Sequence, residues 1–174
     1  EPRGPQEAQD LLAAVKFVSE HPVYGRAQGG LLSICMGAAA TTYAYGSGDL
    51  QQYKNIKAMV AIQPMRYLDF VKALGLPGLL QRWVNAVNSK RVGFDMPAKS
   101  FKDDVQKVSV PTLLVQNDQD EYLNKQSIDE YYASLKVKKE MLWLSGIGTK
   151  RAAGYDYLTN NPEKILYWFD QHMA

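Results

Sequence analysis

The chain has 174 residues, of which 46% are hydrophobic and 22% charged, a balance typical of a globular protein with a packed core. A net charge of +2 without any basic block argues against a dedicated nucleic-acid-binding protein. No apolar stretch approaches the ~18 residues of a membrane span, so we expect no membrane partner. The single cysteine excludes an internal disulfide and favours a reducing, cytoplasmic location.

The first part of the chain alternates helical and strand patterns. Leucines and valines recur at helical spacing over residues 6–20, and the helix ends before Pro22. Residues 29–34 form a short apolar run without alternation, which predicts a strand buried on both faces. A helix of small residues follows to about Tyr45, and residues 57–62 predict a second buried strand.

The second part opens with a less regular stretch. Residues 65–105 predict a helical, lid-like excursion, in which a helix beginning near Pro77 carries an apolar stripe around Trp83 that we expect to be packed. A strand, a helix with a capping box and another strand then follow at residues 110–115, 127–135 and 139–144. A last helix begins at residues 161–162 and is expected to turn Ile165, Trp168 and Phe169 inward.

This order of elements predicts the fold class. Strands that alternate with helices imply crossover connections, a mainly parallel sheet and helices on both of its faces. No repeat and no low-complexity linker divides the chain. We therefore expect an α/β three-layer sandwich that forms a single domain over residues 1–174.

The most informative motif is a turn between the strand at 29–34 and the helix that follows it. Its pattern, small-x-nucleophile-x-Gly, is that of a nucleophile elbow. Ser33 and Gly37 stand two residues before and two after Cys35, where larger side chains are expected to collide. Cys35 would be the nucleophile. The alternative is that Cys35 is only a small buried apolar residue.

With this elbow the chain resembles the C-terminal half of an α/β-hydrolase of the dienelactone-hydrolase-like kind, over about residues 6–172. The resemblance implies hydrolysis of an ester, lactone or thioester, with a small acyl compound as substrate and no cofactor or metal. It places Cys35 as nucleophile and the backbone N–H of Met36 in the oxyanion hole. It makes Asp120 the acid of the triad, with Asp118 as the fallback, whereas the alternative for Asp120 is a carboxylate that caps a turn.

The histidine that the family uses as base has no counterpart in this register, where Arg151 stands instead. His21 and His172 lie elsewhere in the sequence, in a predicted surface loop and in the last turn of the final helix. Arginine stays protonated and cannot act as base. Lys150 could do so only if desolvated, and in a glycine-rich loop we expect it to be exposed. Asp120 is therefore expected to form a structural ion pair with Arg151.

The resemblance also implies that several strands precede the elbow strand, whereas here only one helix does. Without these N-terminal strands, the strand at 29–34 becomes an apolar sheet edge. We therefore expect a homo-oligomer or association with a missing N-terminal segment, and the start at Glu1 is read as that of a fragment or processed chain. Three functions stay open: a hydrolase with an incomplete triad, a catalytically inactive hydrolase-like binding or interaction protein, or a fragment that needs its N-terminal half.

Overall fold

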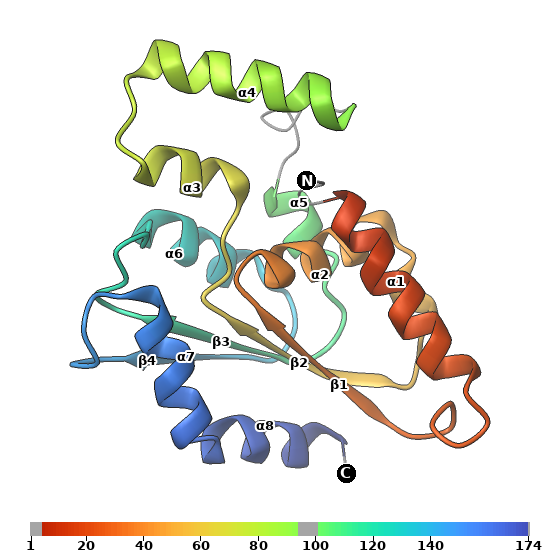
Figure 1. Ribbon diagram of the computed structural model, residues 1–174. Helices are drawn as coiled ribbons and strands as arrows, with labels where there is room; N and C mark the ends of the chain where they lie inside the picture. Colours follow the sequence, from red (N-terminus) through yellow and green to blue (C-terminus); the bar gives the residue numbers. More distant parts are fainter. Residues whose placement is uncertain (1–4, 94–100, 174) are drawn as a thin grey trace.

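Four parallel strands form one sheet at the centre of the computed structural model, which describes residues 5–93 and 101–173 (Figure 1). The strands are β1 (Gly29–Ile34), β2 (Ile56–Ile62), β3 (Thr112–Asn117) and β4 (Lys139–Leu144), and they lie in that order. The register pairs Ile34 with Ile62, Ile62 with Val115 and Asn117 with Leu144. The carboxyl ends of all four strands therefore meet at one edge of the sheet.

Helices cover both faces of this sheet (Figure 1). One face carries α1 (Pro5–Glu20), α2 (Met36–Ser47), α5 (Phe101–Val105) and α6 (Lys125–Ser134). The opposite face carries α7 (Arg151–Asn160) and α8 (Glu163–Met173). The remaining elements are a short 3-10 helix, η1 (Leu50–Gln52), with α3 (Tyr67–Ala73) and α4 (Gly78–Val92). The three-layer α/β sandwich predicted from the order of elements is confirmed.

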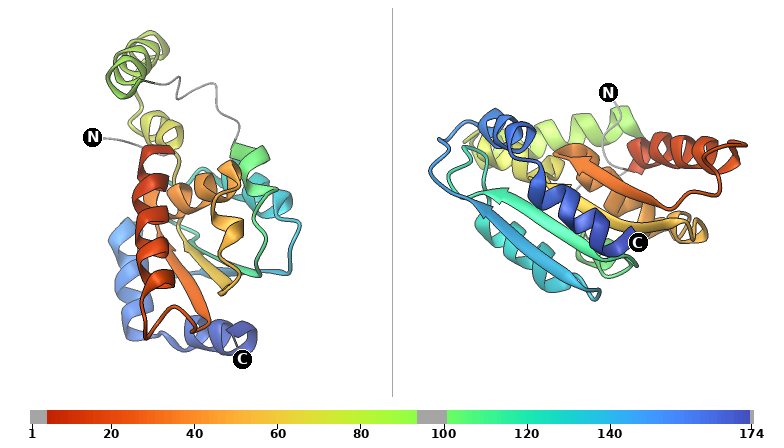
Figure 2. Two further views of the ribbon diagram at one scale, coloured as in Figure 1. Left: turned by 90° about the vertical axis from the view of Figure 1, so that its right-hand side faces the viewer. Right: turned by 90° about the horizontal axis from the view of Figure 1, so that it is seen from below.

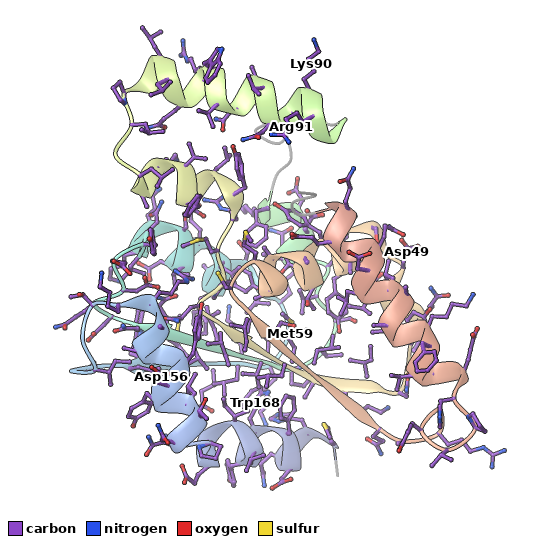
Figure 3. All side chains as sticks on the ribbon, viewed as in Figure 1. Asp49, Met59, Lys90, Arg91, Asp156 and Trp168 are labelled. Carbon is purple, nitrogen blue, oxygen red and sulfur yellow. The ribbon has the colours of Figure 1, made fainter. Side chains whose placement is uncertain are left out.

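The two faces of the sheet bury separate hydrophobic cores, because side chains alternate along β2. Met59 and Ala61 pack with Ala38 of α2 on one face, whereas Ala58, Val60 and Ile62 belong to the core on the other. Figure 3 shows Met59 at the sheet and Trp168 on α8 beneath it. Nearly complete burial of β2 after Lys57 and of β3 explains why residues 58–62 and 113–115 are apolar without alternation.

The prediction that the strand at 29–34 is buried on both faces is wrong. Leu32 is 53% exposed and Ile34 is 43% exposed, and exposure alternates along β1. The reason is its position, since β1 is an edge strand and the described residues contain no strand beyond it. The expectation of an apolar sheet edge is thereby confirmed.

Two helices near the carboxyl end depart from the sequence prediction. The capping box placed a helix start at Ser127, but α6 begins at Lys125, because the side chain of Asn124 caps it by accepting a hydrogen bond of 3.2 Å from the Ser127 N–H. Helix α7 was not predicted at all, because Gly154 in its second turn weakens the helical pattern. The last helix matches its prediction, and Ile165 and Trp168 are buried.

The stretch at 65–105 is helical as predicted where the structure describes it, although residues 94–100 of that prediction lie outside the described part. The apolar stripe of α4 was expected to be packed, and this is wrong, since Trp83 is 63% exposed. The reason is that α4 lies beyond α3, away from the sheet (Figures 1 and 2). Helix α5 instead joins the core through Phe101 and Val105. Among the helices of residues 5–93 and 101–173, none has the length and apolar character that a membrane crossing requires.

Candidate active site

The turn between β1 and α2 holds Cys35 in an uncommon backbone conformation. Its φ of 56° and ψ of −121° lie where residues other than glycine are rarely found. Backbone hydrogen bonds hold the turn: the Cys35 N–H donates to Ile62 O (2.9 Å), and Cys35 O accepts from the N–H groups of Ala38 (3.1 Å), Ala39 (3.4 Å) and Met65 (3.3 Å). Strain of this kind persists only where the surrounding structure over-determines it, and it is common at functional sites.

The residues that flank Cys35 tie the turn to α2. Thr41 donates its hydroxyl proton to Gly37 O (3.0 Å), so the buried Ser33 hydroxyl is the donor in the 2.7 Å bond between Ser33 and Thr41. The expected collision at Gly37 is wrong, because a Cβ added there would meet nothing within 4 Å. The reason is that Gly37 faces open space beside the unpaired edge of β1.

That open space is a groove of about 510 Å³ along the edge of β1. It is lined by residues of α1, β1 and the start of α2, among them Leu11, Leu32, Ile34, Cys35 and Met36. Met36 is the first residue of α2, so its N–H has no acceptor within the helix. Cys35, which is partly buried, therefore lines this groove next to the N-terminus of α2.

Asp120 follows β3 and is bound to Arg151, as the sequence hypothesis expected. The distance from Arg151 Nη1 to Asp120 Oδ2 is 2.7 Å, and the two side chains are 12% and 0% exposed. Asp120 also accepts from the Tyr122 N–H (2.9 Å) and from Gln116 Nε2 (3.3 Å). The carboxylate is thus fully buried and fixed by three donors.

The other two nitrogens of the Arg151 guanidinium also donate hydrogen bonds. Nη2 donates to the carbonyl of Gln63, and Nε donates to the hydroxyl of Tyr155 at 3.1 Å. In turn, the side-chain amide of Gln63 donates a hydrogen bond of 3.0 Å to Arg151 O. Gly154 makes this approach of α7 to β2 possible, since a Cβ there would come within 2.9 Å of the Gln63 amide. Arg151 is therefore held on three sides, by the buried Asp120 and Gln63 and by the partly buried Tyr155.

The charges around Arg151 keep it protonated. Burial lowers the pKa of Arg151, but its interactions with Cys35, Asp120 and Tyr155 outweigh burial, and its pKa is raised above the ordinary value. Arg151 therefore cannot serve as a general base. Equally, the interaction with Cys35 means that the guanidinium lies close enough to stabilise a thiolate.

Tyr155, one turn after Arg151 in α7, extends these contacts. Its hydroxyl accepts a hydrogen bond of 3.1 Å from Arg151 Nε. Burial raises the pKa of Tyr155 to about 12; the nearby Arg151 works against burial, and the interaction with Cys35 adds to it. Asp120, Arg151 and Tyr155 thus form a hydrogen-bonded network, and Cys35 interacts electrostatically with Arg151 and Tyr155.

The alternative acid, Asp118, and the alternative base, Lys150, lie outside this network. Asp118 accepts from the Ser145 hydroxyl at 2.6 Å on the surface. Lys150 is 78% exposed, as expected, and its ammonium group lies 3.2 Å from Glu121 Oε2. Neither residue contacts Cys35 or Arg151 in the described hydrogen bonds.

The two histidines lie towards the other end of the sheet. His21 accepts from the Val23 N–H at 3.2 Å, in the loop that leads into the amino end of β1. The Nδ1 atom of His172, in the last turn of α8, lies 2.8 Å from Trp168 O. Neither histidine takes the place of the missing base.

Sequence reasoning missed Gln63 and Tyr155. Tyr155 follows Arg151 by four residues, a spacing that would have pointed to it had α7 been recognised as a helix. The positive φ of Gln63 (46°) left no signal in the sequence. Within residues 5–93 and 101–173, no group of three histidine, cysteine or acidic side chains is placed to hold a metal ion.

No model of a known protein family matches this sequence, and no curated protein sequence does either. Solved structures do match the fold. A dienelactone hydrolase from Anabaena variabilis superposes with a TM-score of 0.63 and 14% identity, over 96% of this chain and 60% of that one. A Pyrococcus furiosus esterase superposes with a TM-score of 0.65 and 19% identity, over 98% of this chain and 64% of that one. An α/β hydrolase from Penicillium superposes with a TM-score of 0.67 and 18% identity, over 97% of this chain and 72% of that one.

These similarities show that the chain has the α/β-hydrolase fold, as the elbow predicted. The chain spans about 60% of the length of the dienelactone hydrolase and about 64% of the length of the esterase. At sequence identities below 20% these matches establish only the shared fold, since one fold hosts many functions.

Proposed function

We propose that this chain acts on an ester, lactone or thioester through Cys35, as an α/β-hydrolase-fold protein with an incomplete triad that takes up an acyl group faster than it releases it. The observation that supports this proposal is the bonding of Arg151. It stands where the resemblance expects a histidine, and Asp120, Gln63 and Tyr155 hold its guanidinium.

The first half of the reaction needs a thiolate and a site for the developing oxyanion. A thiolate at Cys35 would lie beside the Arg151 cation and the N-terminus of α2, and both stabilise negative charge. Its sulfur would attack the acyl carbon, and the Met36 N–H would receive the oxyanion. Breaking the bond to the leaving group would then leave the acyl group on Cys35.

The second half of the reaction is hydrolysis of the acyl-cysteine, and it needs a base to activate water. Arg151 cannot accept a proton, and Tyr155 with a raised pKa stays protonated near neutral pH. Asp120 is fully buried and already bound to Arg151. Slow release of the acyl group follows from this arrangement.

The test is release of p-nitrophenolate from p-nitrophenyl acetate, followed by absorbance. We expect a burst of about one equivalent per chain followed by a much slower phase, a pattern that indicates accumulation of the acyl intermediate. Cys35→Ala should abolish the burst, and Cys35→Ser serves as the conservative variant. Absence of a burst, or an equal burst from Cys35→Ala, would refute the proposal.

The second candidate is a catalytically inactive hydrolase-like protein that binds a small ligand or a partner. Arg151 favours it too, because a guanidinium whose three nitrogens each donate to a protein group suits a structural role. The same assay separates the two candidates, since a binding protein would show neither a burst nor an adduct on Cys35.

We further propose that the open edge of β1 is covered in the functional protein, by a second copy or by a missing N-terminal segment. Leu32 and Ile34 are exposed beside the groove, and unpaired apolar strand edges promote association. Residues 1–174 would then be part of one domain, in a reducing, cytoplasmic setting that keeps Cys35 a free thiol. Light scattering that finds a monodisperse monomer of this chain would contradict association.

A further inference from the structure

Helix α4 turns its polar side towards the protein and its apolar side outwards. On the inner side, Asn88 donates a hydrogen bond to the Tyr67 hydroxyl of α3, and Gln81 donates to Leu76 O at 2.6 Å. Asn85, which shares this side of the helix, buries its side-chain oxygen. Most surface helices have the opposite arrangement, in which the apolar stripe faces the core.

The outer side of α4 presents four large apolar side chains. Leu79, Trp83 and Val87 follow one another at spacings of four residues and are 82%, 63% and 39% exposed. Leu80, which is 41% exposed, lies beside Trp83 on the same side. Figures 1 and 2 show α4 as the outermost layer of the molecule, with α3 between it and the sheet. An exposed apolar patch that follows one helix face marks an interaction surface.

The charges of α4 around this patch are all positive. The helix contains Arg82, Lys90 and Arg91, which are exposed, and no acidic residue. At 3.6 residues per turn, Arg82 and Arg91 stand about a quarter turn to either side of Trp83, and Lys90 continues the apolar stripe. Figure 3 shows Lys90 pointing away from the sheet. None of the ion pairs between described residues involves these three cations.

We propose that α4 is a membrane-binding helix that lies on an anionic lipid surface, with Trp83 among its anchors. A stripe of leucine and tryptophan bordered by lysine and arginine is typical of helices that bind in the plane of the membrane interface. The expectation of no membrane partner rested on the lack of a spanning segment, which a helix lying on the surface does not need. This inference is independent of the acylation proposed for Cys35.

A second copy of the chain fits the patch less well than lipid does. In a symmetric dimer the same patch meets itself. Two α4 helices would therefore bring the cations of both together, and neither helix has a carboxylate to offset them. An anionic leaflet instead supplies negative headgroups to the cations, and its interface accommodates the tryptophan ring and the leucine side chains.

The test is cosedimentation of the full chain with sucrose-loaded vesicles. One set consists of phosphatidylcholine alone, and the other contains phosphatidylcholine and phosphatidylserine at a ratio of about 2:1. We expect binding to the mixed vesicles to be about 100-fold stronger, because each cation near an anionic surface contributes about fivefold. High salt should abolish the difference by screening the charges.

Variants of α4 and matched controls locate the contact. Arg82→Gln/Lys90→Gln should weaken binding to the mixed vesicles about 25-fold, and Trp83→Ala should weaken it about tenfold. The control for the charges is Lys136→Gln/Lys138→Gln, which removes two exposed lysines before β4. The control for the aromatic anchor is Tyr167→Ala, on the outer side of α8, where Tyr167 is 65% exposed. Both controls should bind within about twofold of the wild type.

Three results would overturn the inference. The first is no binding to the mixed vesicles, and the second is equal weakening by the α4 variants and their controls, which would show a response to net charge alone. The third is an oligomer in light scattering without vesicles that Trp83→Ala converts to a monomer, because a second copy would then occupy the patch. If an α4 variant does not fold, quenching of wild-type tryptophan fluorescence by bromine-labelled acyl chains of mixed vesicles decides, and its absence refutes membrane binding.

Discussion

Replacing Arg151 by methionine should destabilise the fold severely. The substitution keeps side-chain length but removes the cation 2.7 Å from Asp120, and Asp120 stays fully buried. At that distance, an effective dielectric constant of ~20 gives an attraction of about 6 kcal/mol. Desolvation of both groups offsets part of this attraction, and removing one partner of a buried pair typically costs about 3–5 kcal/mol.

The structure places Arg151→Met near the lower end of that range. Asp120 keeps two donors, the Tyr122 N–H and the Gln116 amide, which partly satisfy the carboxylate. We therefore expect a loss of about 3–4 kcal/mol in the free energy of unfolding for Arg151→Met and about 2–3 kcal/mol for Asp120→Asn. Because the double variant leaves no unpaired charge, it should cost no more than Arg151→Met alone, a coupling of about 2–3 kcal/mol.

Urea denaturation of the four proteins, followed by circular dichroism, measures this cycle. Lys150→Met is the control, because Lys150 is exposed and its ion pair with Glu121 should contribute less than about 1 kcal/mol. Additive losses, or an Arg151→Met loss below about 1 kcal/mol, would show that the pair is not a buried structural unit. The conclusion that Arg151 is held in place by its ion pair with Asp120 would then be wrong.

Three further predictions concern the same region and the core. Arg151→His should speed loss of the acetyl group from Cys35 at least about tenfold by supplying a base, and an unchanged rate would count against the missing-base argument. Gly37→Ala should change the free energy of unfolding by no more than about 1 kcal/mol, because its Cβ meets open space. Gly154→Ala should cost about 1–3 kcal/mol by displacing the Gln63 amide, and equal effects of the two alanines in urea would contradict the packing described. Burial raises the pKa to about 12 for Tyr43, Tyr131 and Tyr155. The folded state therefore keeps these protons above pH ~10, where the unfolded chain loses them. Their contribution to the free energy of unfolding is fully present below pH ~10 and is lost as pH rises towards ~12. An absorbance titration in which all tyrosines ionise together near pH ~10 would contradict this prediction.

The parts of the fold that the sequence predicts are those encoded locally. The strands β2 and β3 are predicted by the apolar runs at residues 58–62 and 113–115, which do not alternate because helices cover both sides of the sheet there. The turn at Cys35 can be predicted from the sequence because the whole nucleophile-elbow motif lies within five consecutive residues. The pairing of Asp120 with Arg151 could be expected because both follow neighbouring strands whose carboxyl ends meet.

The features that the sequence did not predict depend on tertiary contacts. Burial of β1 on both faces was inferred from composition, but exposure depends on whether another strand lies beside Leu32 and Ile34. The start of α6 was missed because Asn124 caps it in place of Ser127. Tyr155 went unrecognised because its contact with Arg151 requires α7, a helix whose sequence pattern is weakened by Gly154.

The mass of the protein over time, after a single dose of p-nitrophenyl acetate, tests the central claim most directly. The account predicts that one acetyl group appears on Cys35, persists for far longer than it took to form, and is absent from Cys35→Ala. A protein that stays at its native mass while p-nitrophenolate accumulates beyond one equivalent would have a working base, which contradicts the role assigned to Arg151. A protein that is never acetylated and releases no p-nitrophenolate would leave the binding function in its place.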